Sequence, residues 1–171
     1  ALDFTVKRIA ELTGILLVVF SILIFISLVS YAPEDPNFIF PDNTEIKNIL
    51  GYRGSFVSDL FFQSIGLISI IISITIFFTG INLFRTKRFL LIIENLFYTV
   101  LYSILGSLFF SIFYPNSFWL SINGNGGFIG KFLQDSFLSS LINLNNNIFY
   151  YLLIFLIFFI FLISINFSIN Y

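Results

Sequence analysis

Four long stretches without a charged residue decide what this chain can fold into. Between Arg88 and Lys131, for example, the only charged side chain is Glu94. Each stretch can supply the roughly 20 apolar residues that a helix needs to cross about 30 Å of hydrocarbon. The stretches cover residues 12–33, 60–84, 95–116 and 145–171. Together with a mean hydropathy of +1.00, they predict an all-α membrane protein with four transmembrane helices.

The expected organisation is a single membrane domain over residues 1–171. We place its spans at about 10–31, 60–84, 95–114 and 148–166, its outer loops at 32–59 and 115–147, and a cytoplasmic turn at 85–94. A cleavable signal peptide is the alternative for the first stretch, but that stretch is longer than the 7–15 residues of a typical signal-peptide core. The chain begins at Ala1 and contains no Met, so we expect a piece of a longer protein.

The distribution of basic residues predicts the orientation, because Lys and Arg in short loops resist translocation. The first outer loop contains Lys47 and Arg53 among a larger number of acidic residues, and the second contains Lys131 with Asp135. Basic residues are concentrated instead near the N-terminus and in the turn, as Lys7, Arg8, Arg85, Lys87 and Arg88. Both chain ends are therefore predicted to be cytoplasmic.

Glu94 has two readings, since an acidic residue inside a membrane span is by default a functional candidate. It could form a proton or ion site. It could also mark the end of the cytoplasmic turn, because residues 95–114 span about 30 Å as a helix without it. We favour the boundary reading.

Small residues recur at helical spacing in the second and third spans. Such stripes allow close backbone approach between membrane helices, so we expect these two spans to pack together. A hydroxyl-lined pore is the alternative interpretation. The fourth span has no such stripe and is predicted to face lipid on most sides. The packing candidates are Gly66, Ser69, Ser73, Gly80, Thr99, Ser103, Ser107 and Ser111.

Both outer loops are predicted to contain a short helix. In the first, Asp42 followed by Glu45 resembles an N-cap, with a helix over 43–50 that ends at Gly51. In the second, apolar and polar residues alternate at helical spacing over 129–142, which indicates an amphipathic helix lying in the interface. The glycines of 126–130 lack the Lys and Ser or Thr of a phosphate-binding loop.

The composition excludes several kinds of catalytic and metal-binding site. The chain has no Cys and no His, which removes thiol chemistry, imidazole bases and the usual zinc sites. Its nine carboxylates do not cluster along the sequence. We expect no catalytic, cofactor-binding or metal-binding residue in this chain.

Two segments of the first outer loop resemble a known family. The sequence Ser-Tyr-Ala-Pro-Glu-Asp-Pro at 30–36, and Asn-Ile-Leu-Gly-Tyr-Arg-Gly with a later Asp at 48–59, look like the N-terminal four-helix membrane domain of FtsK/SpoIIIE DNA translocases. The glycine turn at 126–130 also fits, whereas the Phe- and Ile-rich spans depart from the family's usual composition. The residues that carry the resemblance are Ser30, Tyr31, Pro33, Asp35, Pro36, Asn48, Gly51, Gly54 and Asp59.

The resemblance implies a membrane anchor for a cytoplasmic ATP-driven DNA motor that lies outside this chain and works at the division septum in chromosome segregation. ATP, Mg²⁺ and DNA would be bound by that motor. The lipid bilayer, other division proteins and further copies of the chain are the partners expected here, with exposed Arg53 as a possible partner contact. The expected location is the bacterial inner membrane, at the division septum. The alternative function is a small membrane transporter or channel subunit.

Overall fold

The computed structural model describes residues 2–36, 45–117, 119–120, 122–136 and 146–165. These residues form helices and loops and no strand. The elements in chain order are α1 (Leu2–Val29), α2 (Gly51–Ile65), the short 3₁₀ helix η1 (Gly66–Ile68), α3 (Ser69–Thr86), α4 (Leu90–Phe113), α5 (Gly127–Asp135) and α6 (Asn146–Ser164). Four stretches of this helical structure are long and apolar enough to cross a membrane, at Phe4–Val29, Gly51–Thr86, Leu90–Phe113 and Asn147–Ser164. The predicted class, an all-α protein with four spans, is confirmed.

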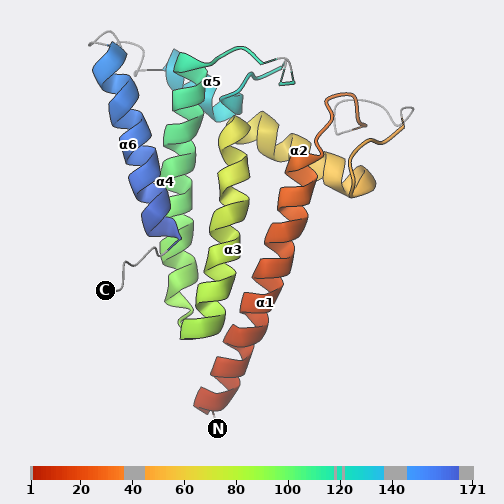
Figure 1. Cartoon of the computed structure of the whole chain (residues 1–171), viewed down its shortest axis with the longest axis vertical. Helices are drawn as coiled ribbons and strands as arrows, with labels where there is room; N and C mark the ends of the chain where they lie inside the picture. Colours follow the sequence, from red (N-terminus) through yellow and green to blue (C-terminus); the bar gives the residue numbers. More distant parts are fainter. Residues whose placement is uncertain (1, 37–44, 118, 121, 137–145, 166–171) are drawn as a thin grey trace.

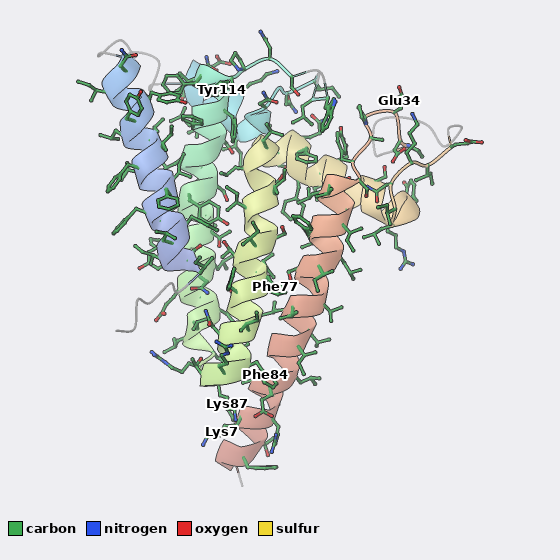
Figure 2. All side chains as sticks on the ribbon, viewed as in Figure 1. Lys7, Glu34, Phe77, Phe84, Lys87 and Tyr114 are labelled. Atoms are coloured by element: carbon green, nitrogen blue, oxygen red, sulfur yellow. The ribbon has the colours of Figure 1, made fainter. Side chains whose placement is uncertain are left out.

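Helices α1, α3, α4 and α6 run side by side along the long axis of the molecule, and α2 lies across one end between α1 and α3 (Figure 1). Lys7 and Lys87 lie at one end of this bundle, whereas Glu34 and Tyr114 lie at the other (Figure 2). We call these the lysine end and the outer end. As expected, the N-terminal end of α1 and the turn between α3 and α4 lie at one end, and the loops that follow α1 and α4 lie at the other. Which end faces the cytoplasm stays a prediction.

The second span differs from the unbroken helix expected over 60–84. The chain turns sharply at Gly66, whose φ of 72° and ψ of −153° lie in a region open mainly to glycine. Groups from other parts of the chain form hydrogen bonds with the backbone at this break. The N–H of Leu67 donates to the carbonyl of Asn125 at 2.9 Å, and the hydroxyl of Ser107 donates to the carbonyl of Ile65 at 2.7 Å. Non-helical backbone is tolerated at membrane depth where protein groups satisfy it in this way. The upright part of the span is therefore α3, and α2 forms a separate transverse helix.

Glycines set the contact between α1 and α3, the two helices that pack most extensively. A Cβ on Gly14 would lie 2.7 Å from the carbonyl oxygen of Gly80, and a Cβ on Gly80 would lie 2.7 Å from that of Gly14. Such distances are too short for any side chain, so the two backbones touch directly. Gly80 therefore belongs to the contact with α1, and not to one with the third span as expected.

At the lysine end, α3 and α4 are joined by a turn shorter than the expected 85–94. Lys87 ends α3 in the left-handed conformation with φ of 59°, and α4 begins at Leu90. The Lys87 ammonium lies 2.6 Å from the carboxylate of Glu11 in α1, which also accepts from Arg8 at 2.6 Å. Glu94 lies on the exposed surface of α4, one turn after its start.

Helix α6 packs mainly on α4 and leaves most of its surface open, as expected for a lipid-facing fourth span. Near the outer end the contact is aromatic. The ring of Tyr150 lies 4.9 Å from that of Phe113 and 5.3 Å from that of Phe109, and its hydroxyl lies 3.1 Å from the hydroxyl of Tyr114. Aromatic residues are favoured at the membrane–water boundary.

The two loop helices also differ from expectation. The sequence predicts a helix over 43–50. The described residues of this segment, 45–50, are not helical, and Gly51 begins α2 instead of ending a helix. Residues 43 and 44 and the proposed N-cap Asp42 lie outside the described residues. The amphipathic helix expected over 129–142 is present as α5, Gly127–Asp135, and residues 137–142 lie outside the described part.

Candidate functional site

The residues that carry the family resemblance gather at the outer end, where the chain leaves α1 and enters α2. We call Ser27, Ser30, Tyr31, Asp35, Pro36, Asn48, Gly54, Ser55 and Asp59 the outer cluster. Seven of these nine are among the residues singled out in the sequence. Ser55, within the second segment, and Ser27, outside both segments, were missed as candidates. Their side chains and backbone groups form hydrogen bonds between the two segments, which are separated in the sequence, so the cluster holds both segments together.

Asp35 organises the first half of the cluster. Its side chain is 1% exposed, and its two carboxylate oxygens accept the backbone N–H groups of Lys47 at 2.8 Å and Asn48 at 2.9 Å. A buried carboxylate is costly unless it is hydrogen-bonded, and these two bonds to charged oxygen are of the stronger kind. Because the carboxylate takes both N–H groups, they are withdrawn from helix formation. This is the physical reason why the described residues 45–50 are not helical, in contrast to the expectation.

Asn48 joins the loop to the end of α1. Its amide nitrogen donates to the carbonyl of Ser27 at 2.9 Å and to that of Ser30 at 3.3 Å. Its amide oxygen accepts the N–H of Leu50 at 3.0 Å. A Cβ on Gly54 would overlap this amide oxygen, so only glycine fits beside Asn48. One contact, between Asn48 and Gly54, therefore accounts for both the Asn and the second Gly of the segment 48–59.

Two serines tie the start of α2 to the end of α1 and to the loop that follows α1. The hydroxyl of Ser27 donates to the carbonyl of Gly54 at 2.6 Å, and that of Ser55 donates to the carbonyl of Pro36 at 2.8 Å. Ser30 accepts the N–H of Ile49 at 3.2 Å. Pro33 is exposed and forms no part of this network, and Gly51, with φ of 65°, supplies the turn into α2.

Tyr31 and Asp59 close the cluster on the side of the second outer loop. The Tyr31 hydroxyl donates to the Asp59 carboxylate at 3.3 Å, and the Gln63 amide donates to the same oxygen at 3.3 Å. The Tyr31 ring packs on Phe62 at 4.9 Å. Burial, followed by the neighbouring Asp59 carboxylate, raises the pKa of Tyr31 above its usual range. The tyrosine is thus held neutral as a hydrogen-bond donor.

An exposed ion pair borders the cluster. The Lys47 ammonium pairs with the Glu34 carboxylate, both largely exposed to solvent. Lys47 lowers the pKa of Glu34, and Glu34 raises that of Lys47, in each case mainly through their hydrogen bond. Exposed pairs of this kind contribute little to stability.

A second polar group lies inside the bundle and was not predicted. The hydroxyl of Thr75 in α3 lies 2.9 Å from that of Tyr102 in α4 and 3.1 Å from that of Ser164 in α6. One helical turn away, the Asn95 amide donates to the Thr79 hydroxyl at 2.8 Å. We call these five residues the interior polar cluster, and all five are buried. The spacing of Thr75, Thr79 and Asn82 on one helical face was the signal available in the sequence.

The predicted packing residues are found in several different contacts. Ser73 of α3 and Ser21 of α1 line one groove between these two helices, and Thr99 of α4 lines a groove shared with α1 and α3. Gly66 lies against the turn at Asn125, and Ser107 and Ser111 lie against Gly126 and Gly130. The hydroxyl of Ser111 bonds Gln134 of α5. Ser69 is fully buried, and Ser103 bonds the carbonyl of Thr99 within its own helix. The third span's stripe therefore meets α5 and the helix break more than α3.

Arg53 lies in the first turn of α2, exposed, at the edge of an apolar groove of about 370 Å³ between α1 and α2. Among the described residues it forms no ion pair. The prediction that Arg53 contacts a division protein stays a prediction. No group of His, Cys, Asp or Glu that could hold a metal ion occurs within the described ranges.

Four apolar helical stretches, with buried polar groups bonded to one another, define the chain as a multi-pass membrane domain. It belongs to the family described as the 4TM region of DNA translocase FtsK/SpoIIIE, whose family model matches residues 6–170.

Two curated relatives give the same result. The chain is 29% identical over 130 residues to a protein named DNA translocase FtsK from Rhizobium meliloti (strain 1021), and 28% identical over 127 residues to a protein of the same name from Bradyrhizobium diazoefficiens. The alignments cover 76% and 74% of this chain and 15% of each relative. The chain thus corresponds to a small part of these relatives. No solved structure matches it.

Proposed function

We propose that this chain is the membrane anchor of a DNA translocase and holds an ATP-driven DNA motor at the division septum for chromosome segregation. The observation that carries the proposal is the match of nearly the whole chain to the membrane region of that family. The relatives bear the name DNA translocase, and most of their length lies outside the aligned part. ATP, Mg²⁺ and DNA would be bound by that remaining part.

The geometry supports an anchoring role. The outer cluster fixes the path from α1 to α2, and the interior polar cluster links α3, α4 and α6. In both, the polar side chains bond other groups of the bundle. A transporter or channel subunit, the alternative function, is expected to have polar groups that line a path for its substrate. Here the hydroxyls of Thr75, Tyr102 and Ser164 face one another.

The orientation suits a motor attached after α6. The basic residues Lys7 and Lys87 lie at one end (Figure 2), where the positive-inside tendency would place the cytoplasm. Helix α6 runs from the outer end toward that same end (Figure 1). A chain continuing after α6 would therefore enter the compartment that holds the DNA. The lipid bilayer, division proteins and further copies of the chain are the partners we propose.

Localisation tests the proposal. The chain, fused to a fluorescent protein after Tyr171, should gather at mid-cell in dividing bacteria. An unrelated four-span membrane protein with the same reporter serves as the control and should label the whole membrane. Uniform fluorescence from the chain's own fusion would refute septal anchoring.

Three measurements on the purified chain separate an anchor from the alternatives. An anchor should neither hydrolyse ATP nor bind duplex DNA at physiological salt, where binding depends on a large basic surface. In liposomes it should leave an imposed membrane potential intact. Dissipation of that potential would favour a channel or transporter.

A further inference from the structure

We propose that the groove between α1 and α2 binds one anionic phospholipid, with the phosphate on Arg53 and an acyl chain along α1. We call it the Arg53 groove. Its walls are formed by Phe20, Leu23 and Ile24 of α1 and by Leu50 and Val57 at the start of α2, with Ser27 and Gly54 at their junction. This site goes beyond the anchoring function and does not depend on the septum.

The lining is suited to hydrocarbon. Phe20 and Leu23 are 56% and 44% exposed on the surface of a helix that spans the membrane, so lipid is their natural neighbour. Phe20, Leu23, Ile24 and Ser27 follow the i, i+3, i+4, i+7 spacing of one helical face. The groove therefore extends about 10 Å along the axis of α1. An acyl chain can lie in it parallel to the helix.

Among the described lining residues, Arg53 provides the one charged group. The only other side-chain polar atom is the hydroxyl of Ser27, which already donates to the carbonyl of Gly54 at 2.6 Å. Four described carboxylates lie within 20 positions of Arg53 in the sequence. Three are engaged elsewhere: Asp35 by two backbone N–H groups, Glu34 by Lys47, and Asp59 by Tyr31 and Gln63. The fourth, Glu45, is exposed and forms no ion pair with Arg53 in the described structure. The guanidinium is thus left for an external anion, and it matches a phosphate with paired N–H donors.

The depth of the groove agrees with a lipid headgroup. Ser27 lies in the last turn of α1, which ends at Val29, and Arg53 follows the first residue of α2 by two positions. Helix α2 lies across the outer end of the bundle (Figure 1). Arg53 therefore lies near the level where lipid phosphates meet the ends of membrane helices, and the apolar wall lies directly below it. A zwitterionic lipid offers the same chain but no net negative charge.

Native mass spectrometry of the purified 171-residue chain tests the site. Phosphatidylglycerol should bind about tenfold or more tightly than phosphatidylcholine, because the choline ammonium of phosphatidylcholine offsets the phosphate charge with which Arg53 pairs. Arg53→Gln should remove this difference. Lys131→Gln, which removes another exposed basic residue from the second outer loop, should leave it unchanged. Inorganic phosphate should not displace the lipid, because the acyl chain supplies part of the binding.

A second pair of variants tests the apolar wall without changing charge. Leu23→Trp fills the groove and should weaken the binding of both lipids. Ile22→Trp, exposed on the opposite side of the same helix and outside the groove, should not. Circular dichroism checks that each variant is folded.

The proposal is overturned if both lipids bind equally, if Arg53→Gln binds phosphatidylglycerol like the parent chain, or if Leu23→Trp has no effect. Loss of the mid-cell band in Arg53→Gln with unchanged lipid binding would assign Arg53 to a protein partner instead. An Arg53-dependent lipid site in a chain that does not localise to mid-cell would refute the proposed function and leave the lipid site standing.

Discussion

Gly14 and Gly80 meet backbone to backbone, each placed so that a Cβ on one would lie 2.7 Å from the carbonyl oxygen of the other. Small residues allow membrane helices to approach closely, and here the approach fixes α1 against α3. Neither partner can relax by rotating a side chain, because both contacts are with backbone atoms. The crossing is therefore sensitive to a single methyl group.

Gly80→Ala should destabilise the bundle by about 1–3 kcal/mol, the usual cost of overpacking. In an unconstrained helix the same change is stabilising by roughly 0.5–1 kcal/mol. Destabilisation by Gly80→Ala would thus indicate the close backbone contact, and stabilisation would indicate its absence. Unfolding in sodium dodecyl sulfate, followed by circular dichroism, provides the measurement. Leu16→Ala on the exposed face of α1 should change little, and a stabilised Gly80→Ala would contradict the close crossing.

Asp35→Ala should destabilise the outer end by about 1–3 kcal/mol, because the backbone N–H groups of Lys47 and Asn48 would be left without their acceptor. Hydrogen exchange at these two amides should rise together with the loss in stability. Glu34→Gln is the matched control one residue away. It removes the charge of Glu34 from an exposed ion pair with Lys47, so it should change the unfolding transition little. Equal effects of the two changes would show that Asp35 does not organise the loop.

Tyr31 predicts a dependence of stability on alkaline pH. Burial and the Asp59 carboxylate raise the pKa of Tyr31 in the folded chain above the value near 10 of an unfolded tyrosine. The neutral hydroxyl therefore stabilises the fold fully below about pH 10, and this contribution is lost as the pH rises toward the folded pKa.

Tyr31→Phe should consequently flatten the decline of stability above about pH 10, measured as the denaturant midpoint against pH. Tyr52→Phe, at an exposed position in α2, should keep the decline of the parent chain. Identical profiles for Tyr31→Phe and the parent would argue against a buried, neutral Tyr31.

Thr75→Val should weaken the attachment of α6 by about 1–2 kcal/mol, since one hydroxyl serves both Tyr102 and Ser164. Increased proteolysis of α6 in detergent would report this. Ser103→Ala removes a hydroxyl that bonds only within α4, so it should have a smaller effect. A larger effect at Ser103 would place the important contact elsewhere.

The absence of native Cys allows the orientation to be tested directly. Single Cys residues at Ser117 and at Thr86 lie at opposite ends of the bundle. With an impermeant thiol reagent applied to intact cells, Ser117→Cys should react and Thr86→Cys should stay protected. Reaction of Thr86→Cys in intact cells would reverse the predicted topology.

The four spans could be predicted from the sequence because their signal is length and apolarity, which a bilayer imposes on any spanning helix. The break at Gly66 could not, since a glycine in an apolar stretch also suits close helix packing. Its conformation is explained by contact with Asn125, far along the chain. The pairing of Thr75 with Ser164 is likewise a matter of tertiary structure.

The outer cluster could be predicted from the sequence only in part. Family resemblance identified most of its residues, but not what they do. Local propensity favoured a helix over 43–50, and the bonds from Asp35 to the N–H groups of Lys47 and Asn48 override that preference. Ser27 and Ser55 carry no signal of their own, because serine is common in both loops and helix interfaces.

The attachment of α6 has a mechanical consequence. Its bonds to the bundle near its end run through Ser164 to Thr75, and through the carbonyl of Ile165 to the amide of Asn82 at 3.1 Å. Tension applied beyond Ile165, parallel to the helix axes, would load these bonds and the α4–α6 contact in shear, along their whole length. Interfaces loaded in this direction share the force among many contacts, instead of opening one contact at a time.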